Sequence, residues 1–116
     1  MSKMCVFESD NLGIAKESTA LPERLIEGNP QFKSWDVDSD KDGKVRAGIW
    51  EATPGITRSI KGETWEFCHI LSGVAEISED GGETIRVEAG SSFVLKPGFL
   101  GVRNTIETLR KIWVVA

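Results

Sequence analysis

Turn-forming residues recur at short, even intervals through the second half of the chain. Breaks that contain glycine come about every eight residues, a spacing typical of all-β sandwiches and barrels. They are Thr53-Pro54-Gly55, Lys61-Gly62, Ser72-Gly73, Asp80-Gly81-Gly82, Ala89-Gly90 and Pro97-Gly98. The runs between these breaks are too short for ordinary helices and are rich in β-branched and aromatic residues. We therefore predict an all-β fold.

The breaks also place the individual strands. A hairpin is expected where Trp35 and Val37, and then Ala47 and Ile49, alternate with polar residues on either side of a turn at 38–43. Further strands are predicted at residues 74–79, 83–87, 92–95, 100–105 and 111–115. Before the hairpin we predict a short edge strand at 4–7, an irregular arm at 8–19 and one helical turn at 22–27.

The predicted turn at 38–43 resembles half of a calcium-binding loop. Asp38, Asp40, Asp42 and Gly43 stand where such a loop has its first acids and its glycine. The position of the essential final glutamate is Ile49, and both flanks are predicted strands rather than helices. A solvated turn without calcium is therefore the better interpretation.

Length and charge limit the protein further. The 116 residues suit one structural domain, and 14 basic against 18 acidic residues give a net charge of −4. No block of lysines and arginines is present, which argues against a nucleic-acid partner. No apolar run approaches the roughly 20 residues that span a bilayer, and residues 1–10 lack the apolar region of a signal peptide. We expect a cytoplasmic protein whose two cysteines are reduced.

The run at 64–71 carries the sole histidine of the sequence and one of its cysteines. In a strand, the even-numbered residues, among them Glu66 and Cys68, lie on one face, and the odd-numbered ones, among them His69, lie on the other. Because a buried carboxylate is costly, Glu66 must lie at a cavity mouth, be bonded or be functional. The odd-numbered face is also apolar, so the arm or a second subunit must cover it, and we expect a homodimer.

Several spacings in this half of the chain resemble the cupins. Glu66 and Gly73 match the end of the first cupin motif, and Gly90 with Lys96-Pro97-Gly98 is similar to the second. More narrowly, residues 48–115 resemble small single-domain cupins related to ureidoglycine aminohydrolase. The resemblance implies a double-stranded β-helix, the cupin jelly-roll barrel, with an N-terminal arm. We assign residues 1–42 to the arm and edge strands and 43–116 to the cupin domain.

The resemblance fails at the metal ligands. The two histidines of the first motif fall on Ser59 and Lys61 when four residues separate the second histidine from Glu66. With three residues between them the two histidines fall on Ile60 and Gly62, which are no metal ligands either. The third histidine falls on Gly101. We therefore expect no typical cupin metal site; a divalent metal at Glu66 is the alternative. In the place of a metal, the Lys61 ammonium is expected to neutralise Glu66.

The remaining candidates form a polar pocket. The predicted ligand-binding residues are Arg46, Trp50, Ser59, Lys61, Glu66, Cys68 and Arg103. Arginine presents a planar fork suited to a carboxylate or ureido-like group, and tryptophan supplies an apolar wall. The simpler interpretations are a solvated face for Arg46 and Arg58, core for Trp50, a small buried hydrophobe for Cys68 and a structural role for His69.

Three functions remain open on this basis. The first is a module that binds a small polar metabolite in the barrel without a metal. The second is a metabolic enzyme similar to ureidoglycine aminohydrolase, which the resemblance alone implies, because a fold does not fix a function. The third is a structural or regulatory homodimer, which a barrel filled by side chains would favour.

Overall fold

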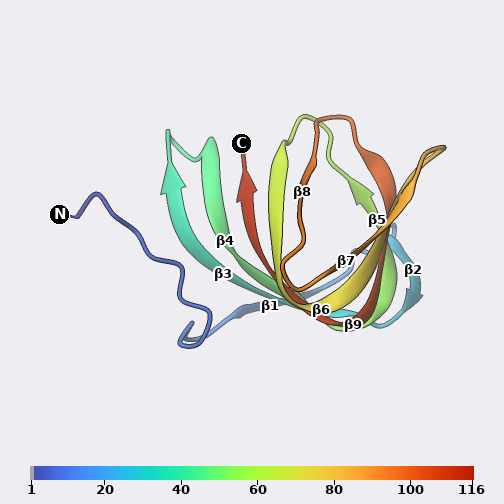
Figure 1. The fold of residues 1–116 in the computed structure, drawn as a ribbon, viewed down its shortest axis with the longest axis horizontal. Coiled ribbons are helices and arrows are strands. Elements are labelled where there is room, and N and C mark those ends of the chain that lie inside the picture. Colours follow the sequence, from blue (N-terminus) through green and yellow to red (C-terminus); the bar gives the residue numbers. More distant parts are fainter. Residues whose placement is uncertain (1) are drawn as a thin grey trace.

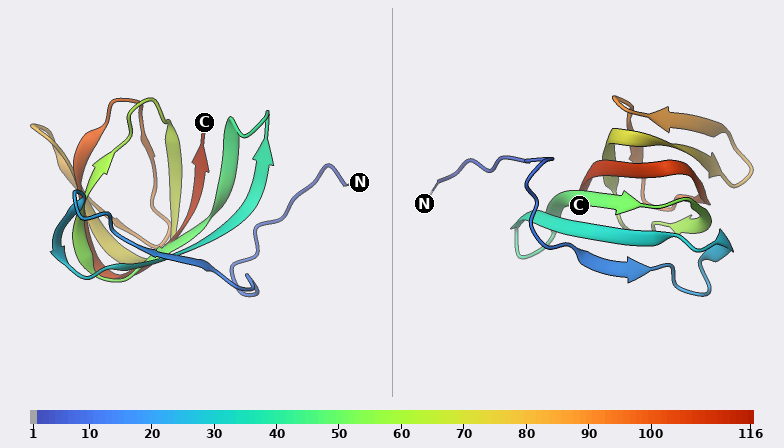
Figure 2. Two further views of the ribbon diagram at one scale, coloured as in Figure 1. Left: turned by 180° about the vertical axis from the view of Figure 1, so that it is seen from behind. Right: turned by 90° about the horizontal axis from the view of Figure 1, so that it is seen from below.

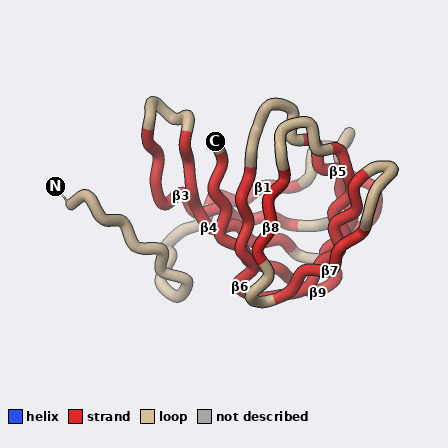
Figure 3. The backbone as a smooth tube through the Cα atoms, turned by 45° about the horizontal axis from the view of Figure 1, so that its top comes forward, coloured by secondary structure: helices blue, strands red, loops and turns tan. Residues whose placement is uncertain are grey.

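The computed structural model describes residues 2–116, and within this range it holds nine β-strands and no helix (Figures 1 and 3). The strands are β1 Lys16–Thr19, β2 Leu25–Gly28, β3 Gln31–Asp40, β4 Val45–Ala52, β5 Gly55–Ile60, β6 Glu66–Glu79, β7 Thr84–Glu88, β8 Ser92–Leu95 and β9 Leu100–Val115. The predicted all-β fold is confirmed. No described segment is a helix of the length and hydrophobicity needed to cross a membrane.

The two longest strands, β6 and β9, organise the barrel. They pair antiparallel along their length and curve together from one wall of the barrel to the other (Figures 1 and 2). In the first wall, the start of β6 pairs with β8, and the end of β9 pairs with β4, followed by β3 and β1. In the second wall, the end of β6 pairs with β7, and the start of β9 pairs with β5, followed by β2.

Gly73 marks the bend of β6 between the walls. The β6–β9 register shifts three times between Ile70 and Ala75, and Gly73 has a φ of +88°. A Cβ at Gly73 would collide with the backbone carbonyl of Thr108, so a glycine is needed here for both conformation and space. The break predicted at Ser72-Gly73 was therefore wrong, because the chain bends inside one strand. The strands predicted at 100–105 and 111–115 are likewise the two ends of β9.

The structure confirms the predicted hairpin and corrects the N-terminal predictions. β3 and β4 pair across a tight turn in which Lys41, Asp42 and Gly43 all have positive φ. Residues 4–7 form no strand and belong to an extended segment that leaves the barrel (Figure 2). The one helical turn predicted at 22–27 lies instead at 21–25, because β2 pairs with β5 from Leu25 onward. β1 lies within the segment predicted as an irregular arm.

The core lies between the two walls. Its buried cluster comprises Ile70, Ala75, Ile77, Val87, Leu95 and Leu109. The alternation predicted for the run at 64–71 is confirmed, because Glu66, Cys68 and Ile70 are buried whereas Phe67 and His69 are only half-buried. The even-numbered side chains of this strand therefore face the barrel interior.

The N-terminal arm covers part of the outer face of the first wall. The indole N–H of Trp35 donates to the carbonyl of Gly13 at 3.2 Å, and Arg110 donates to the carbonyl of Ser9 at 3.0 Å. Nearer β8, Val94 and Trp65 keep 40% and 36% of their surface exposed. The outer face is thus only partly covered within one chain.

Candidate functional site

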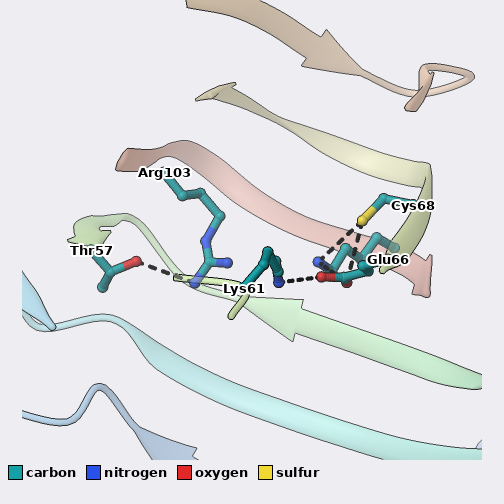
Figure 4. Close-up of polar contacts among 6 residues, drawn as sticks. Thr57, Lys61, Glu66, Cys68 and Arg103 are labelled. Carbon is teal, nitrogen blue, oxygen red and sulfur yellow. Dashed lines mark hydrogen bonds and ion pairs between the residues drawn. The ribbon is translucent and has the colours of Figure 1, made fainter. Parts of the chain in front are cut away.

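Two lysines hold the Glu66 carboxylate. Lys61, just after β5, donates to Oε1 of Glu66, and Nζ of Lys111 on β9 lies 3.0 Å from Oε2 (Figure 4). The Glu66 side chain is only 7% exposed. Burial alone would raise its pKa, but the positive charges of Lys111 and Lys61 outweigh this effect and lower the pKa to about 2. Glu66 is therefore ionised at neutral pH.

Cys68 lies beside the same carboxylate, one inward position along β6. Its thiol donates to Oε2 of Glu66 at 3.3 Å, and Nζ of Lys111 lies 3.5 Å from the sulfur. Burial raises the pKa of this thiol to about 11; Lys111 opposes the rise and Glu66 adds to it. Because the thiolate is the nucleophilic form, Cys68 at neutral pH is a buried thiol rather than an activated nucleophile.

Arg103 is a third cation, and it is held differently. It lies opposite Thr57 in the β5–β9 register and donates to the Thr57 hydroxyl at 3.2 Å (Figure 4). Its guanidinium carbon lies 4.4 Å from the centroid of the Trp50 ring and 5.8 Å from that of Phe32. Burial lowers its pKa below the ordinary value, against the opposing effect of Glu66. Among the described residues, Arg103 forms no ion pair with a carboxylate.

Glu66, its two lysines and Arg103 line one cavity of about 360 Å³ at the mouth of the barrel, whereas Cys68 is buried behind it. The cavity is lined by Phe32, Ser34, Trp50, Lys61, Glu66, Arg103, Lys111 and Trp113. The space deeper in the barrel, towards Ile70 and Leu109, is only about 20 Å³, which is room for a water molecule at most. The barrel interior is thus filled by side chains while its mouth is open.

The structure brings together most of the predicted pocket residues. Ser59 lines the small inner space beside the cavity, and Trp50 forms part of the cavity wall. Arg46 is exposed and lies outside the cavity, beside Asp36 and Asp38 on the β3–β4 hairpin. That the predicted pocket residues bind a ligand stays a prediction.

Arg58 and His69 have their partners outside the cavity. Arg58 forms a two-pronged ion pair with Asp80 on the surface, with N–O distances of 2.8 and 2.7 Å. Nδ1 of His69 lies 2.7 Å from the hydroxyl of Ser92 on the outer face. These contacts fit the simpler, structural interpretation of both residues.

Lys111, Phe32 and Thr57 were missed by the sequence reasoning. Lys111 carried one signal, since Leu109, Lys111 and Trp113 alternate on one face of the last strand. A lysine between two inward apolar residues must find a partner. The partner itself could not be predicted, because it depends on the β4–β9 and β6–β9 pairing that sets Lys111 opposite Trp50 and Ile70.

Comparison with known proteins identifies the family. Residues 39–113 match the EutQ-like cupin domain family, which is more than half of the chain. The chain belongs to this cupin family. The predicted cupin resemblance is therefore confirmed, while the narrower relation to ureidoglycine aminohydrolase stays a prediction. No curated protein matches the chain.

Solved structures support the cupin fold. The chain is similar to a protein of unknown function from Pseudomonas syringae pv. tomato, with a TM-score of 0.80 and 23% identity over 92% of this chain and 46% of that one. The EutQ protein of Clostridium difficile has a TM-score of 0.65 and 17% identity over 84% of this chain and 79% of that one. Ectoine synthase from P. lautus has a TM-score of 0.67 and 20% identity over 80% of this chain and 68% of that one. This chain thus spans about half the length of the Pseudomonas protein. At these identities the similarity concerns the fold alone.

The donor groups of this cupin do not fit a typical cupin metal centre. Ser59 and Gly101, where the resemblance places two of the histidines, lie opposite each other in the β5–β9 pairing. A Cβ at Gly101 would collide with the carbonyl of Ser78, so the position leaves no room for a ligand side chain without a backbone shift. Among residues 2–116 no three histidine, cysteine, aspartate or glutamate side chains gather around a common point. Glu66 is instead bonded to two ammonium groups.

Proposed function

We propose that this cupin binds a small anionic metabolite at the mouth of its barrel and does so without a metal. The observation that carries the proposal is the charge of the cavity. Its lining holds three cations, Lys61, Arg103 and Lys111, against one carboxylate, Glu66, so two positive charges are in excess. Partly buried cations without counter-ions are costly, and an anionic ligand removes that cost.

Each residue has a distinct role in this proposal. Arg103 binds an acidic group through its planar fork, and the Thr57 hydroxyl and the Trp50 ring hold the guanidinium in place. Lys61 and Lys111 each present further N–H donors beyond the one that Glu66 accepts. Glu66 thereby positions two ammonium groups instead of ligating a metal. The aromatic side chains give the ligand an apolar wall.

The shape of the cavity supports a metabolite rather than a macromolecule. A volume of about 360 Å³ lies near the lower end of the range of small-molecule pockets. Because the deeper barrel is filled, the ligand is expected at the mouth, in contact with solvent. The filled inner barrel by itself favours the purely structural function. The cavity at the mouth is large enough for a metabolite, which argues against that function.

A thermal-shift screen tests the proposal with matched pairs of ligands. Small carboxylates are expected to raise Tm at low ionic strength, whereas their neutral amides, sugars and ureides are not. High salt should weaken the effect of the carboxylates. Stabilisation by neutral ureides but by no anion would contradict the proposal and favour the ureidoglycine-related enzyme.

Metal analysis of the purified protein tests the metal-free part separately. We expect no divalent metal in stoichiometric amount and no change of Tm on addition of a chelator. One equivalent of bound manganese, zinc or nickel that is lost in the Glu66→Gln variant would overturn this part. The exposed Glu107→Gln variant serves as the matched control.

A further inference from the structure

The positive charge at the barrel mouth is divided between two centres that differ in their donors. The first centre is Arg103, which uses one N–H on the Thr57 hydroxyl and has no carboxylate partner among the described residues. A guanidinium has five N–H donors in a planar fork, and that geometry matches the two oxygens of a carboxylate.

The second centre is the pair Lys61 and Lys111. Both ammonium groups contact Glu66, so a single negative charge is shared between two positive ones. Their side chains are 19% and 10% exposed, which limits how far water can screen the remaining charge. One positive charge is therefore left over at this centre, as one is left over at Arg103.

Both centres lie beside the same aromatic side chain, that of Trp50. The Arg103 guanidinium carbon lies 4.4 Å from the Trp50 ring centroid, and Nζ of Lys111 lies 4.9 Å from a Trp50 ring. Phe32 packs against Trp50, with their ring centroids 5.1 Å apart. A chain of a few carbon atoms along this aromatic wall can therefore reach both cations at once, with its apolar part against the rings.

From this arrangement we propose that the ligand is a small dicarboxylate, with one carboxylate on the fork of Arg103 and the other on the lysine pair. The inference rests on the proposed anion-binding function and makes it more specific. A monoanion would leave one of the two centres without a counter-ion. A compact anion such as inorganic phosphate cannot place charge at both centres in the way that two carboxylates on a carbon chain can.

Calorimetric titration of the wild-type protein tests this proposal. The probes are succinate, glutarate and adipate, each compared with the monocarboxylate of the same chain length, which is butyrate, valerate or hexanoate. We expect at least one dicarboxylate to bind about tenfold or more tightly than its matched monocarboxylate, the ratio expected from one additional charge-assisted contact. Inorganic phosphate is expected to bind more weakly than that dicarboxylate.

Variants of Arg103 identify the contact. Arg103→Met should abolish the preference for the dicarboxylate, and Arg103→Lys, which keeps the charge without the fork, should retain part of it. Arg46→Met, an exposed arginine outside the cavity, is the matched control and should leave the preference unchanged. Because the ligand-free Arg103 has no counter-ion, Arg103→Met should fold with a Tm no lower than that of the wild type, which keeps the binding result interpretable.

The possible outcomes separate the two proposals. Equal affinities for dicarboxylates and monocarboxylates would overturn the proposal of a dicarboxylate ligand but not that of an anion site. Tighter binding of phosphate than of every dicarboxylate would have the same consequence. If neither dicarboxylates nor monocarboxylates bind, the anion site is overturned as well. A dicarboxylate preference that survives in Arg103→Met overturns the assignment of the fork.

Discussion

The ammonium group of Lys111 lies 3.0 Å from Oε2 of Glu66, although 45 positions separate the two residues. The contact joins the end of β9 to the start of β6, the two strands that build both walls of the barrel. Together with Lys61 it places a carboxylate and two cations where the cupin resemblance places a metal. This charge arrangement makes the site sensitive to acid.

The stability of the protein should depend on the ionisation of Glu66. Its pKa is lowered from 4.5 to about 2 in the folded state, so its contribution is fully present above pH 4.5 and is lost as the pH falls towards 2. This lowering corresponds to roughly 3 kcal/mol. Glu66→Gln should be less stable at pH 7, and the difference from wild type should shrink in acid, as measured by urea unfolding.

Glu107→Gln, an exposed substitution of the same kind, is the control for this pH series. It should follow the wild-type curve within experimental error. A Glu66→Gln variant whose deficit stays constant from pH 7 to pH 2.5 would show that the carboxylate charge contributes nothing to folding.

Removal of Lys111 should weaken the same site. Lys111→Met leaves Glu66 with Lys61 as its one cationic partner among the described residues, and the loss of a charge-assisted hydrogen bond should cost about 2 kcal/mol. In the double variant Glu66→Gln/Lys111→Met the loss should be smaller than the sum of the single losses, since the two residues interact. Lys33→Met on β3 is the exposed control. Strictly additive losses would mean that the 3.0 Å contact carries no coupling energy.

The sequence predicted those features of the site that depend on local pattern. The alternation at 64–71 placed Glu66 and Cys68 on the inward face, and this inference needed the pattern of one strand only. The pairing of Lys61 with Glu66, which the structure contains, was expected from the cupin resemblance, because Lys61 stands where the first motif has a metal histidine.

Features that depend on pairing between distant strands were not predicted. Lys111 joins the site because β9 pairs with both β4 and β6, and no sequence pattern fixes that register. Arg103 was predicted as a pocket residue, but its stacking on Trp50 was not predicted, because this contact also depends on the pairing of distant strands. The continuous β6 was divided at Gly73 because a glycine at a bend and a glycine at a turn give the same sequence signal.

Cys68 should resist alkylation in the folded protein. It is fully buried and burial raises its thiol pKa to about 11, whereas Cys5 is exposed. At pH 7.5 iodoacetamide should therefore modify Cys5 readily and Cys68 only after unfolding. Peptide mass spectrometry measures both sites in one sample, with Cys5 as the internal control. Rapid native modification of Cys68 would revive its interpretation as a nucleophile.

The bend at Gly73 should tolerate no side chain. Gly73→Ala adds a Cβ that collides with the Thr108 carbonyl, whereas Gly90 has a similar φ of +91° and no atom within 4 Å of the place that a Cβ would take. Gly90→Ala should cost about 1 kcal/mol from the left-handed conformation alone. Gly73→Ala should cost about 1–3 kcal/mol more from crowding. Thermal unfolding compares them, and equal losses would show that the bend can widen freely.

The exposed apolar residues on the outer face near β8 allow the predicted homodimer to be tested. Phe67 lies between Val94 and Val114 in the strand pairing, and Val94 is 40% exposed. Aliphatic surface of this kind on a sheet is stabilised when a second copy covers it. Sedimentation of the wild-type protein should show a dimer, and Val94→Lys should shift it to the monomer without unfolding. Ile106→Lys, at a residue that is also 40% exposed but lies at the bend of β9, should leave the dimer intact. A wild-type protein that sediments as a monomer at all concentrations would overturn the predicted dimer.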